Sequence, residues 1–413
     1  MIPISFLNRA GPALGLGFLL AFASCAGQTY FISLFSGEIR AELGLTHGGF
    51  GALYTVATLG SGLLLLWLGK AADRIAIPTL GIMTLLALAG FAALLAHAQS
   101  YLALCFALFG LRLCGQGMLS HLSVTAMARW FDRERGRALG IAALGYSAAE
   151  AIFPSLAALL LSSMSWREVW SSASFSILII VIPAVFALGR LSESRGLTRS
   201  AEADTPSEQT KPRLSSWTRQ DVLRDVRFYM LLPGLMAPPA IVTGVLFHQV
   251  HLVESKSWAL ADFAACYPFY AAGSVVIGLA AGWFADRFST AKLLPLYLLP
   301  MACGLVFLAF SNTLISAALF MALTGATIGA ATIVLGAIWA ELYGTEHLGS
   351  IRSLSIAVLV LSTAIAPGLM GQLLDMGVRL ETQFLAMAIY TAACSAVFLA
   401  MQPTLTARSP AYG

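Results

Sequence analysis

Twelve long apolar segments constrain the fold of this chain more than any other feature. Each holds about 20 or more mostly apolar residues, the length that an α-helix needs to cross a hydrocarbon core about 30 Å thick. Because charged residues make up only 11% of the 413 residues, against about 25% in a typical soluble domain, the surface of a soluble fold could not be solvated. The expected spans are 12–36, 47–69, 79–98, 101–126, 138–163, 167–189, 228–252, 260–284, 292–311, 313–340, 350–374 and 382–402.

This pattern predicts an all-α polytopic membrane protein with twelve transmembrane helices. It excludes a soluble enzyme and a disordered chain, and the net charge of +4 is too small for a nucleic-acid-binding protein. The first apolar run, from Arg9 past Cys25, resembles a signal peptide, but it continues without interruption and is expected to be an uncleaved first span. The six Cys residues form no paired motif, so neither a metal nor a cofactor is expected.

The distribution of basic residues predicts the orientation. By the expected spans, 19 of the 24 Lys and Arg residues fall in one set of loops and tails, four fall in the other set, and only Arg112 lies inside a span. Since cytoplasmic loops carry the excess of Lys and Arg, both termini are expected in the cytoplasm, with the protein in the plasma (inner) membrane.

The chain also contains an internal duplication. A polar segment, 191–227, separates an N-terminal half, 1–190, from a C-terminal half, 228–413, and a short amphipathic helix is expected near the end of this linker. Three landmarks repeat at one common offset: the G-x-x-x-D-R segments at 69–74 and 282–287, Gly136 and Gly349, and Pro154 and Pro367. A shared offset indicates two pseudo-symmetric six-helix bundles.

Together these features resemble the major facilitator superfamily of secondary transporters, over essentially the whole chain. The segment Leu111-Arg112-Leu-Cys-Gly115-Gln116-Gly117 is similar to the family's Arg motif in span four. Segments 128–136 and 343–352 look most like the monocarboxylate and organic-anion transporter branch. The resemblance implies two bundles that expose a central site alternately to each side, with a gate at Gly69, Asp73, Arg74, Gly282, Asp286 and Arg287. Asp73 and Asp286 are expected to accept hydrogen bonds at a helix N-terminus.

Two charges in the membrane interior are the main candidates for function. Arg112 in span four and Glu150 in span five lie near mid-membrane on neighbouring antiparallel helices, where a charge costs about 2.5–3.5 kcal/mol. The duplication places Gly325 and Thr363 at the equivalent positions, so only the N-terminal half carries these charges.

Three interpretations of this pair remain open. In the first, Arg112 and Glu150 form a structural salt bridge. In the second, Arg112 binds a substrate carboxylate and Glu150 carries the coupling proton, which makes the protein a proton-coupled symporter of a small organic anion. In the third, Glu150 keeps the proton, and the protein is a proton-driven efflux antiporter for a neutral or cationic solute. Gln116 and Tyr146 are expected to share the faces of Arg112 and Glu150, respectively.

Other polar residues are weaker candidates for the substrate or proton pathway. His248 and His251 are three residues apart, so we expect both on one helix face near the outer end of span seven. Gln28, Tyr267 and Tyr270 are expected to line the cavity. Since no HExxH, P-loop or GxSxG motif is present, the protein is not expected to be an enzyme. The expected partners are a small solute, protons and the lipid bilayer, with no nucleic acid, and the protein is expected to act as a monomer.

Overall fold

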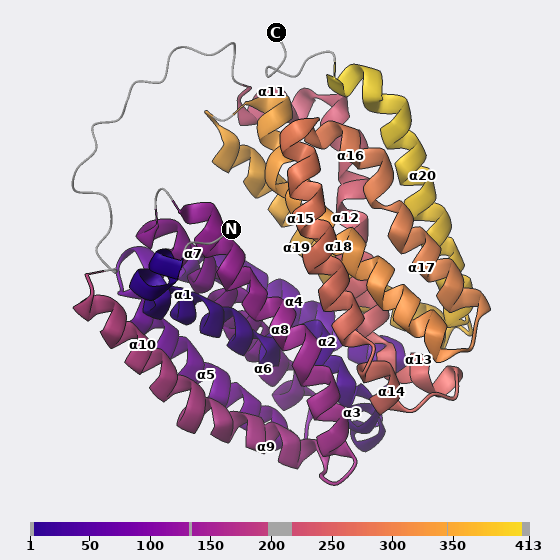
Figure 1. Cartoon of the computed structure of the whole chain (residues 1–413). Helices are drawn as coiled ribbons and strands as arrows, with labels where there is room; N and C mark the ends of the chain where they lie inside the picture. Colours follow the sequence, from indigo (N-terminus) through magenta and orange to yellow (C-terminus); the bar gives the residue numbers. More distant parts are fainter. Residues whose placement is uncertain (1–3, 132–133, 197–216, 345, 407–413) are drawn as a thin grey trace. The chain divides into compact units, whose positions relative to one another are not determined.

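The structure is a computed structural model of the chain, and it describes residues 4–131, 134–196, 217–344 and 346–406 (Figure 1). All regular structure in these ranges is helical. Twelve helical segments are long and apolar enough to span a membrane, which confirms the predicted fold class. They are Arg9–Gly27, His47–Asp73, Ile77–Ala96, Tyr101–Trp130, Arg135–Leu161, Trp166–Ser194, Val226–Phe247, Leu260–Arg287, Thr290–Phe310, Leu314–Tyr343, Leu348–Asp375 and Leu380–Leu405.

The chain divides into two compact units, Met1–Ser207 and Glu208–Gly413. The helices of the N-terminal unit, indigo to magenta in Figure 1, are α1 Ile4–Ala23, η1 Ser24–Gly27, α2 Thr29–Ile32, η2 Ser33–Phe35, α3 Ser36–Leu43, α4 His47–Leu68, η3 Gly69–Asp73, α5 Ile77–Ala96, α6 Tyr101–Leu111, η4 Arg112–Leu119, α7 Ser120–Trp130, α8 Arg135–Leu161, α9 Trp166–Ser176, η5 Ile177–Val181 and α10 Ile182–Ser194.

The C-terminal unit, drawn in pink through orange to yellow, repeats the six-span arrangement. Its helices are α11 Arg219–Arg224, α12 Val226–Phe247, α13 Gln249–Ser255, α14 Leu260–Ala264, α15 Tyr267–Arg287, α16 Thr290–Tyr297, α17 Leu299–Phe310, α18 Leu314–Tyr343, α19 Leu348–Asp375 and α20 Leu380–Thr406. Of the predicted linker, residues 197–216 lie outside the described part of the chain. The helices on either side extend into the expected linker, because α10 continues to Ser194 and α12 begins at Val226. The helix α11 is the short helix expected near the end of the linker.

Helix packing in each unit follows one pattern. In the N-terminal unit, α1 packs against α8 and α10, α6 packs against α4 and α5, and α5 packs against α9. The counterparts in the C-terminal unit are the packing of α12 against α19 and α20, of α18 against α15 and α17, and of α17 against α20. The same pairs of spans therefore meet in both units, as the sequence duplication predicts.

The first and seventh spans differ from the sequence-based expectation. A continuous first helix over 12–36 is wrong, because the chain leaves the helix at Gln28, where φ is −82° and ψ is 146°, and resumes at Thr29. The small residue Gly27 sits at this break, and a Cβ there would lie 2.1 Å from the Leu111 carbonyl oxygen. Close packing against the fourth span therefore accompanies the break. The seventh span ends at Phe247, before the expected 252.

Proline residues in the C-terminal unit leave carbonyl groups without a helical partner, and polar side chains satisfy two of them. Pro238 has no N–H to donate to the Gly234 carbonyl, and the Tyr297 hydroxyl donates to that oxygen at 2.8 Å. Pro295 likewise leaves the Ala291 carbonyl free, which accepts a hydrogen bond from the Gln402 amide. In a bilayer, where water cannot serve this purpose, such replacements keep a Pro-containing helix stable.

A buried or half-buried ion pair ties loop and helix ends together at one end of each unit. In the N-terminal unit, Arg167 at the start of α9 pairs with Glu42 of α3 and also donates to the Ala96 and Ala98 carbonyls. In the C-terminal unit, Lys256 after α13 lies 3.4 Å from Glu381 of α20 and donates to Asn312. The two clusters occupy corresponding connections, but the acidic and basic partners have exchanged places.

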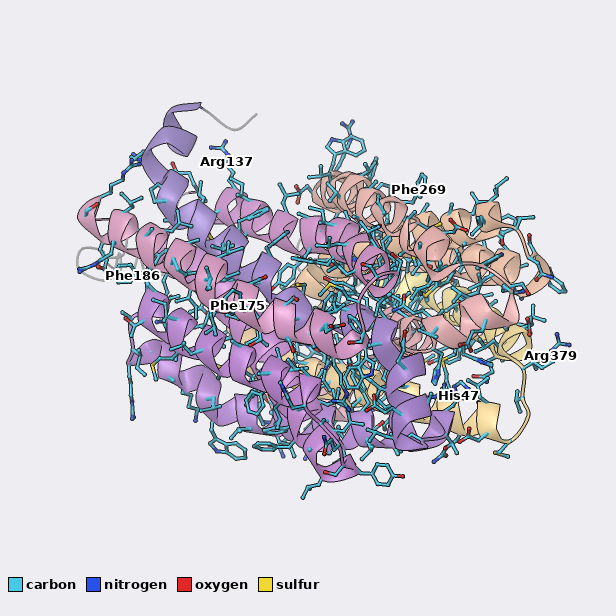
Figure 2. The ribbon with its side chains drawn as sticks, turned by 90° about the horizontal axis from the view of Figure 1, so that it is seen from below. His47, Arg137, Phe175, Phe186, Phe269 and Arg379 are labelled. Carbon is cyan, nitrogen blue, oxygen red and sulfur yellow. The ribbon has the colours of Figure 1, made fainter. Side chains whose placement is uncertain are left out.

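Large apolar side chains remain exposed on the outer faces of the helices. Phe175 of α9 and Phe186 of α10 are labelled in Figure 2, and they are 64% and 53% exposed. Around a transmembrane bundle this surface contacts lipid, so the exposure of such residues is expected.

Candidate functional site

Arg112 is buried where the first, second and fourth spans meet. Only 4% of the residue is exposed, and its Nη1 atom donates to the Gly27 carbonyl at 3.1 Å and to the Thr29 hydroxyl at 3.3 Å. The guanidinium carbon lies 5.2 Å from the centre of the Tyr54 ring, within the range of a cation–π interaction. The Tyr54 hydroxyl and the Thr29 hydroxyl are 2.7 Å apart, which completes a polar cluster of three side chains and one carbonyl.

The break in the first span explains why this cluster forms. The chain turns at Gln28, and this places the Gly27 carbonyl and the Thr29 hydroxyl on either side of the break, both facing Arg112. Gly27 and Gly115 allow the two spans to approach, because a Cβ on Gly115 would lie 2.6 Å from the Gly27 backbone. Gln28 itself donates to Ser24 at 3.3 Å and is only partly buried.

The fourth span is wound as a π-helix from Arg112 to Leu119. Single π-helical turns are uncommon and frequently occur at functional sites, because they re-aim side chains on an otherwise regular helix. Gln116 lies inside this segment, and its Oε1 atom is buried without a hydrogen-bond partner in the described structure. The Nε atom of Arg112 is also buried and unpaired. One donor and one acceptor in this segment are therefore unsatisfied.

Glu150 lies on α8, and Tyr146 lies four residues before it on the same helix face. The helix α8 packs against α7, which begins at Ser120 directly after the π-helix. Glu150 is partly buried, and none of the described Lys or Arg residues lies within 4 Å of its carboxylate. Pro154, four residues later, removes the helical donor for the Glu150 carbonyl.

Arg112 and Glu150 do not form a salt bridge with each other. Within the described residues, no carboxylate lies within 4 Å of the Arg112 guanidinium. Its observed partners come from the first two spans, and the sequence interpretation did not include Thr29 or Tyr54. One sequence signal could have found Tyr54, since the offset that carries Gly69 onto Gly282 also carries Tyr54 onto Tyr267.

The candidates in the C-terminal unit mostly have partners inside that unit. His248 is 3% exposed, and its Nε2 atom lies 2.9 Å from the Pro367 carbonyl oxygen of α19. The fully buried Tyr267 donates its hydroxyl to Gln249 at 2.8 Å. The helix is interrupted at His248, which is the N-cap of α13, and the His251 ring lies 3.9 Å from the Glu254 carboxylate.

Tyr270 is also buried, and its backbone forms part of a close helix contact. A Cβ on Gly325 would lie 2.1 Å from the Tyr270 carbonyl oxygen. Gly325 is the counterpart of Arg112, so the C-terminal unit has a tight contact between α15 and α18 where the N-terminal unit has a buried cation.

Comparison with known proteins agrees with this architecture. The sequence profile of the Major Facilitator Superfamily matches residues 17–265, more than half of the chain. The chain belongs to the major facilitator superfamily. No curated protein matches it in sequence.

Solved structures of transporters share the fold at low sequence identity. A bacterial homologue of the human lysosomal transporter Spinster, in an inward-facing and unoccupied conformation, has a TM-score of 0.72 at 13% identity, with 97% of this chain and 98% of that chain covered. The nucleoside transporter NupG has a TM-score of 0.70 at 13% identity, with coverage of 95% and 99%. At such identity the likeness shows the fold alone. Membership of the superfamily, together with the twelve spans of the described chain, makes the protein a multi-pass membrane transporter rather than an enzyme.

The G-x-x-x-D-R motif of this major facilitator protein forms a charge network in the N-terminal unit. Asp73 pairs with Arg129 of α7, which also donates to the Ala72 carbonyl, and the Gly69 carbonyl lies 3.2 Å from a ring nitrogen of His121. Arg74 is exposed. The partner of Asp73 is therefore a side chain of the fourth span, whereas a helix N-terminus was expected.

The second copy of the motif has different contacts. Gly282 lies in the last two turns of α15, Asp286 is exposed, and the Arg287 guanidinium lies 5.7 Å from the Trp283 ring centre. Asp286 does not serve as the expected cap, because Glu341 of α18 accepts from the Thr290 N–H and from Ser289 at the start of α16. The two G-x-x-x-D-R motifs are alike in sequence and differ in their contacts. Of the segments used for the branch resemblance, residues 132–133 and 345 lie outside the described structure.

Proposed function

We propose that this transporter is a proton-coupled symporter of a small organic anion of the monocarboxylate type. It would work by alternating access, as a monomer in the plasma (inner) membrane with both termini cytoplasmic. Arg112 would bind the carboxylate, with Gln116 and Gln28 nearby, and Glu150 with Tyr146 would carry the proton. His248, His251, Tyr267 and Tyr270 would belong to the part of the pathway in the C-terminal unit, and the two G-x-x-x-D-R motifs to the gate.

One observation carries the anion-binding part of this proposal. The Arg112 guanidinium is almost completely buried, it has only neutral partners, and its Nε donor is unpaired. A buried charge without a counter-ion is costly, so such residues in membrane spans usually face a ligand or a partner. A carboxylate bound to Nε and a terminal nitrogen would provide both the missing charge and the missing acceptor.

The surroundings of Glu150 support the proton-carrying part. A carboxyl group inside a membrane span without a cationic partner is more stable when it is protonated and neutral. Glu150 and Tyr146 lie on α8, which packs against α7, the helix that directly follows the π-helix containing Arg112 and Gln116. A change in the charge of Glu150 would therefore act on the helix segment that holds the anion-binding residue.

The alternative is a proton-driven efflux antiporter for a neutral or cationic solute or drug. The same unpaired Glu150 favours it, because a carboxylate that releases its proton could accept a cationic solute in exchange. The two functions differ in the direction of the pH gradient that drives accumulation.

Transport by purified protein in liposomes tests the role of Arg112. We expect an inward proton gradient to accelerate the uptake of a labelled monocarboxylate, and Arg112→Lys to reduce this uptake at least tenfold, because Lys lacks the planar fork that binds both carboxylate oxygens. The exposed Arg137, labelled in Figure 2, provides the control, and Arg137→Lys should transport normally. Unchanged uptake by Arg112→Lys would exclude the carboxylate-binding role.

A second variant tests the role of Glu150 separately. Glu150→Gln resembles the protonated residue, so we expect it to exchange anion for anion across the membrane but to lose acceleration by the pH gradient. If Glu150→Gln keeps the full response to the gradient, Glu150 does not carry the proton. If a neutral or cationic solute accumulates inside the liposomes under an outward proton gradient, the antiporter is favoured.

A further inference from the structure

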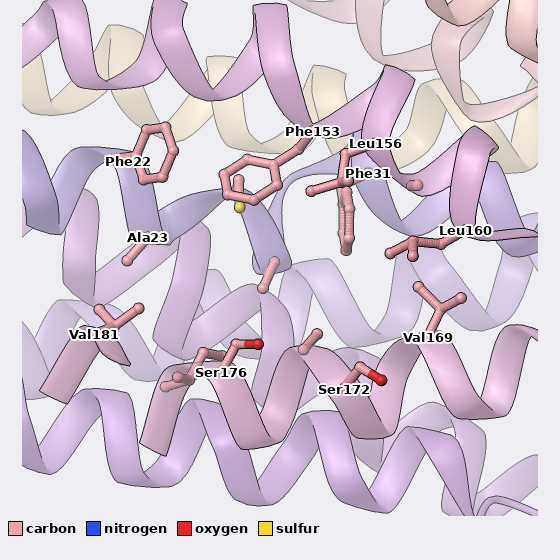
Figure 3. Close-up of a pocket in the computed structure, with 15 residues that line it drawn as sticks. Phe22, Ala23, Phe31, Phe153, Leu156, Leu160, Val169, Ser172, Ser176 and Val181 are labelled. Carbon is pink, nitrogen blue, oxygen red and sulfur yellow. The ribbon is translucent and has the colours of Figure 1, made fainter. Parts of the chain in front are cut away.

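An elongated apolar cavity lies in the N-terminal unit between the first, fifth and sixth spans (Figure 3). Its volume is about 170 Å³. Phe22, Phe153 and Leu156 form one side, and Ser172 and Ser176 of α9 lie on the opposite side in the close-up. It is separate from the cluster around Arg112, since none of the residues that contact the guanidinium lines it.

Helix irregularities and small residues together create this space. The 3-10 turn η1 contributes Cys25 and Ala26, and the π-helix η5 contributes Ile177 and Val181. Ala173 is among the small residues of the α9 wall, which leave room where larger side chains would close the gap. The aromatic wall is continuous, because the ring centres of Phe22 and Phe153 are 4.8 Å apart and those of Phe31 and Phe153 are 6.1 Å apart.

The length and depth of the cavity fit one leaflet of a bilayer. Its lining on the sixth span runs from Val169 to Val181, which corresponds to about 18 Å at a rise of about 1.5 Å per residue. Half of a hydrocarbon core about 30 Å thick is about 15 Å. The lining begins at Val169, three residues after the start of α9 at Trp166, so the cavity lies in the leaflet at that end of the span. In the predicted orientation this is the outer leaflet.

Some residues that line the cavity are also exposed on the surface of the N-terminal unit. Leu156 on the rim of the cavity is 41% exposed, and Phe175 and Ile180 on the adjacent turns of the sixth span are 64% and 65% exposed. Water is a poor occupant, because a bound water needs two to four polar partners and an apolar cavity of this size stays dry but accepts apolar ligands. The medium outside the cavity consists of acyl chains.

We propose that the cavity binds a short segment of one acyl chain of a membrane phospholipid. The chain lies along the sixth span with its methylene groups against Phe22, Phe31 and Phe153. Neither Ser172 nor Ser176 has a hydrogen-bond partner among the described residues, so the Ser172 hydroxyl, nearer to the membrane surface, is free to donate to the ester carbonyl of the same lipid. The site is independent of the transported solute, and it makes a bilayer lipid part of the folded N-terminal unit.

Photolabelling tests the site directly. The full-length protein is reconstituted with phosphatidylcholine that carries a diazirine in one acyl chain, and labelled residues are mapped by peptide mass spectrometry after irradiation. We expect labelling of Phe153, Leu156 and Ser172 to exceed that of the exposed Phe186 on α10 at least fivefold. Equal labelling of cavity and surface residues would show ordinary lipid contact and overturn the proposal.

A matched pair of variants provides the second readout. Ala173→Phe places a large side chain in the cavity, and we expect it to reduce labelling there at least fivefold. Ala187→Phe makes the same change on an exposed face of α10, and labelling should stay at the level of the unmodified protein. If Ala173→Phe does not elute as a folded monomer, Ser176→Phe fills the same space from an exposed position. Undiminished labelling in a folded cavity-filling variant would also overturn the proposal.

Discussion

At the scale of single residues, the environment of Arg112 differs from the one that its sequence neighbourhood suggested. Helix spacing placed Arg112 and Glu150 at similar depth, which made a salt bridge a reasonable hypothesis. The observed partners are the Gly27 carbonyl, the Thr29 hydroxyl and the Tyr54 ring. Sequence periodicity gives the depth of a residue in a span and the face it shares with its neighbours. It does not give the rotation of one helix against another, and this rotation selects the partners of a buried charge.

A pH-dependent prediction belongs to the residue scale. The Arg167 guanidinium beside Glu42 holds the pKa of that carboxyl below its ordinary value. The ion pair therefore stabilises the folded protein fully above the ordinary Glu pKa of about 4.3, and this contribution is lost as pH falls through the lower pKa of the folded state. Since the Glu42 side chain is 46% exposed, we expect Glu42→Gln to cost only about 0.2–1 kcal/mol at pH 7.

Thermal unfolding in detergent at a series of pH values measures this effect. The difference in Tm between the unmodified protein and Glu42→Gln should be largest near neutral pH. It should shrink as pH falls below the ordinary Glu pKa of about 4.3 and vanish below the lower pKa of the folded state. Glu38 is exposed on the same helix, and Glu38→Gln should leave Tm unchanged throughout. A difference that grows on acidification would contradict the assignment.

At the scale of helices, local composition predicted the spans, and contacts between helices determined their irregularities. A run of about 20 apolar residues is sufficient to place a transmembrane helix, so the sequence located all twelve spans. The first and seventh spans end earlier than expected. The break at Gln28 and the π-helix over Arg112–Leu119 were not predicted. Both lie at the close approach of Gly27 and Gly115, which are far apart in the sequence, and no local pattern reports that approach.

The corresponding helix pair of the C-terminal unit packs through glycines and yields a second prediction. A Cβ on Gly325 would lie 2.1 Å from the Tyr270 carbonyl oxygen, and this backbone atom cannot move without separating α15 from α18. We expect Gly325→Ala to destabilise the protein by about 1–3 kcal/mol, the usual cost of overpacking. Gly336 on the same helix has no atom within 4 Å of an added Cβ, so Gly336→Ala should cause no loss.

Thermal unfolding of both variants in the same detergent tests this contact. A lower Tm for Gly325→Ala alone is the expected result. Equal values of Tm for the two variants would mean that the close contact between α15 and α18 does not limit stability.

At the scale of the whole molecule, two copies of one architecture differ in the chemistry of their polar groups. Equivalent spans pair in both units, as the sequence duplication predicts. The ion pair at the connecting loops is reversed between them, from Arg167 and Glu42 to Glu381 and Lys256. The repeat thus preserves apolar packing, because packing depends on shape. The ion pair tolerates an exchange of its acidic and basic partners, because it needs only opposite charges at the two positions. The two candidate charges of the membrane interior are not repeated at all, because Gly325 and Thr363 stand at the positions equivalent to Arg112 and Glu150.

This asymmetry predicts different roles for two equivalent tyrosines. The Tyr54 hydroxyl lies 2.7 Å from the Thr29 hydroxyl that accepts from Arg112, whereas the Tyr267 hydroxyl donates to the Gln249 side chain. Tyr54→Phe keeps the aromatic ring over Arg112 and loses only the hydroxyl, so we expect the KM for the anion to rise about three- to tenfold. Tyr267→Phe should raise KM less than Tyr54→Phe does, because the Tyr267 hydroxyl is held by Gln249. Both variants lose one buried hydrogen bond and should lose similar stability, about 1 kcal/mol. Uptake kinetics in liposomes and thermal unfolding of the same preparations separate the two effects. A rise in KM for Tyr267→Phe that equals or exceeds the rise for Tyr54→Phe would contradict the assignment of the anion to Arg112 and its partners.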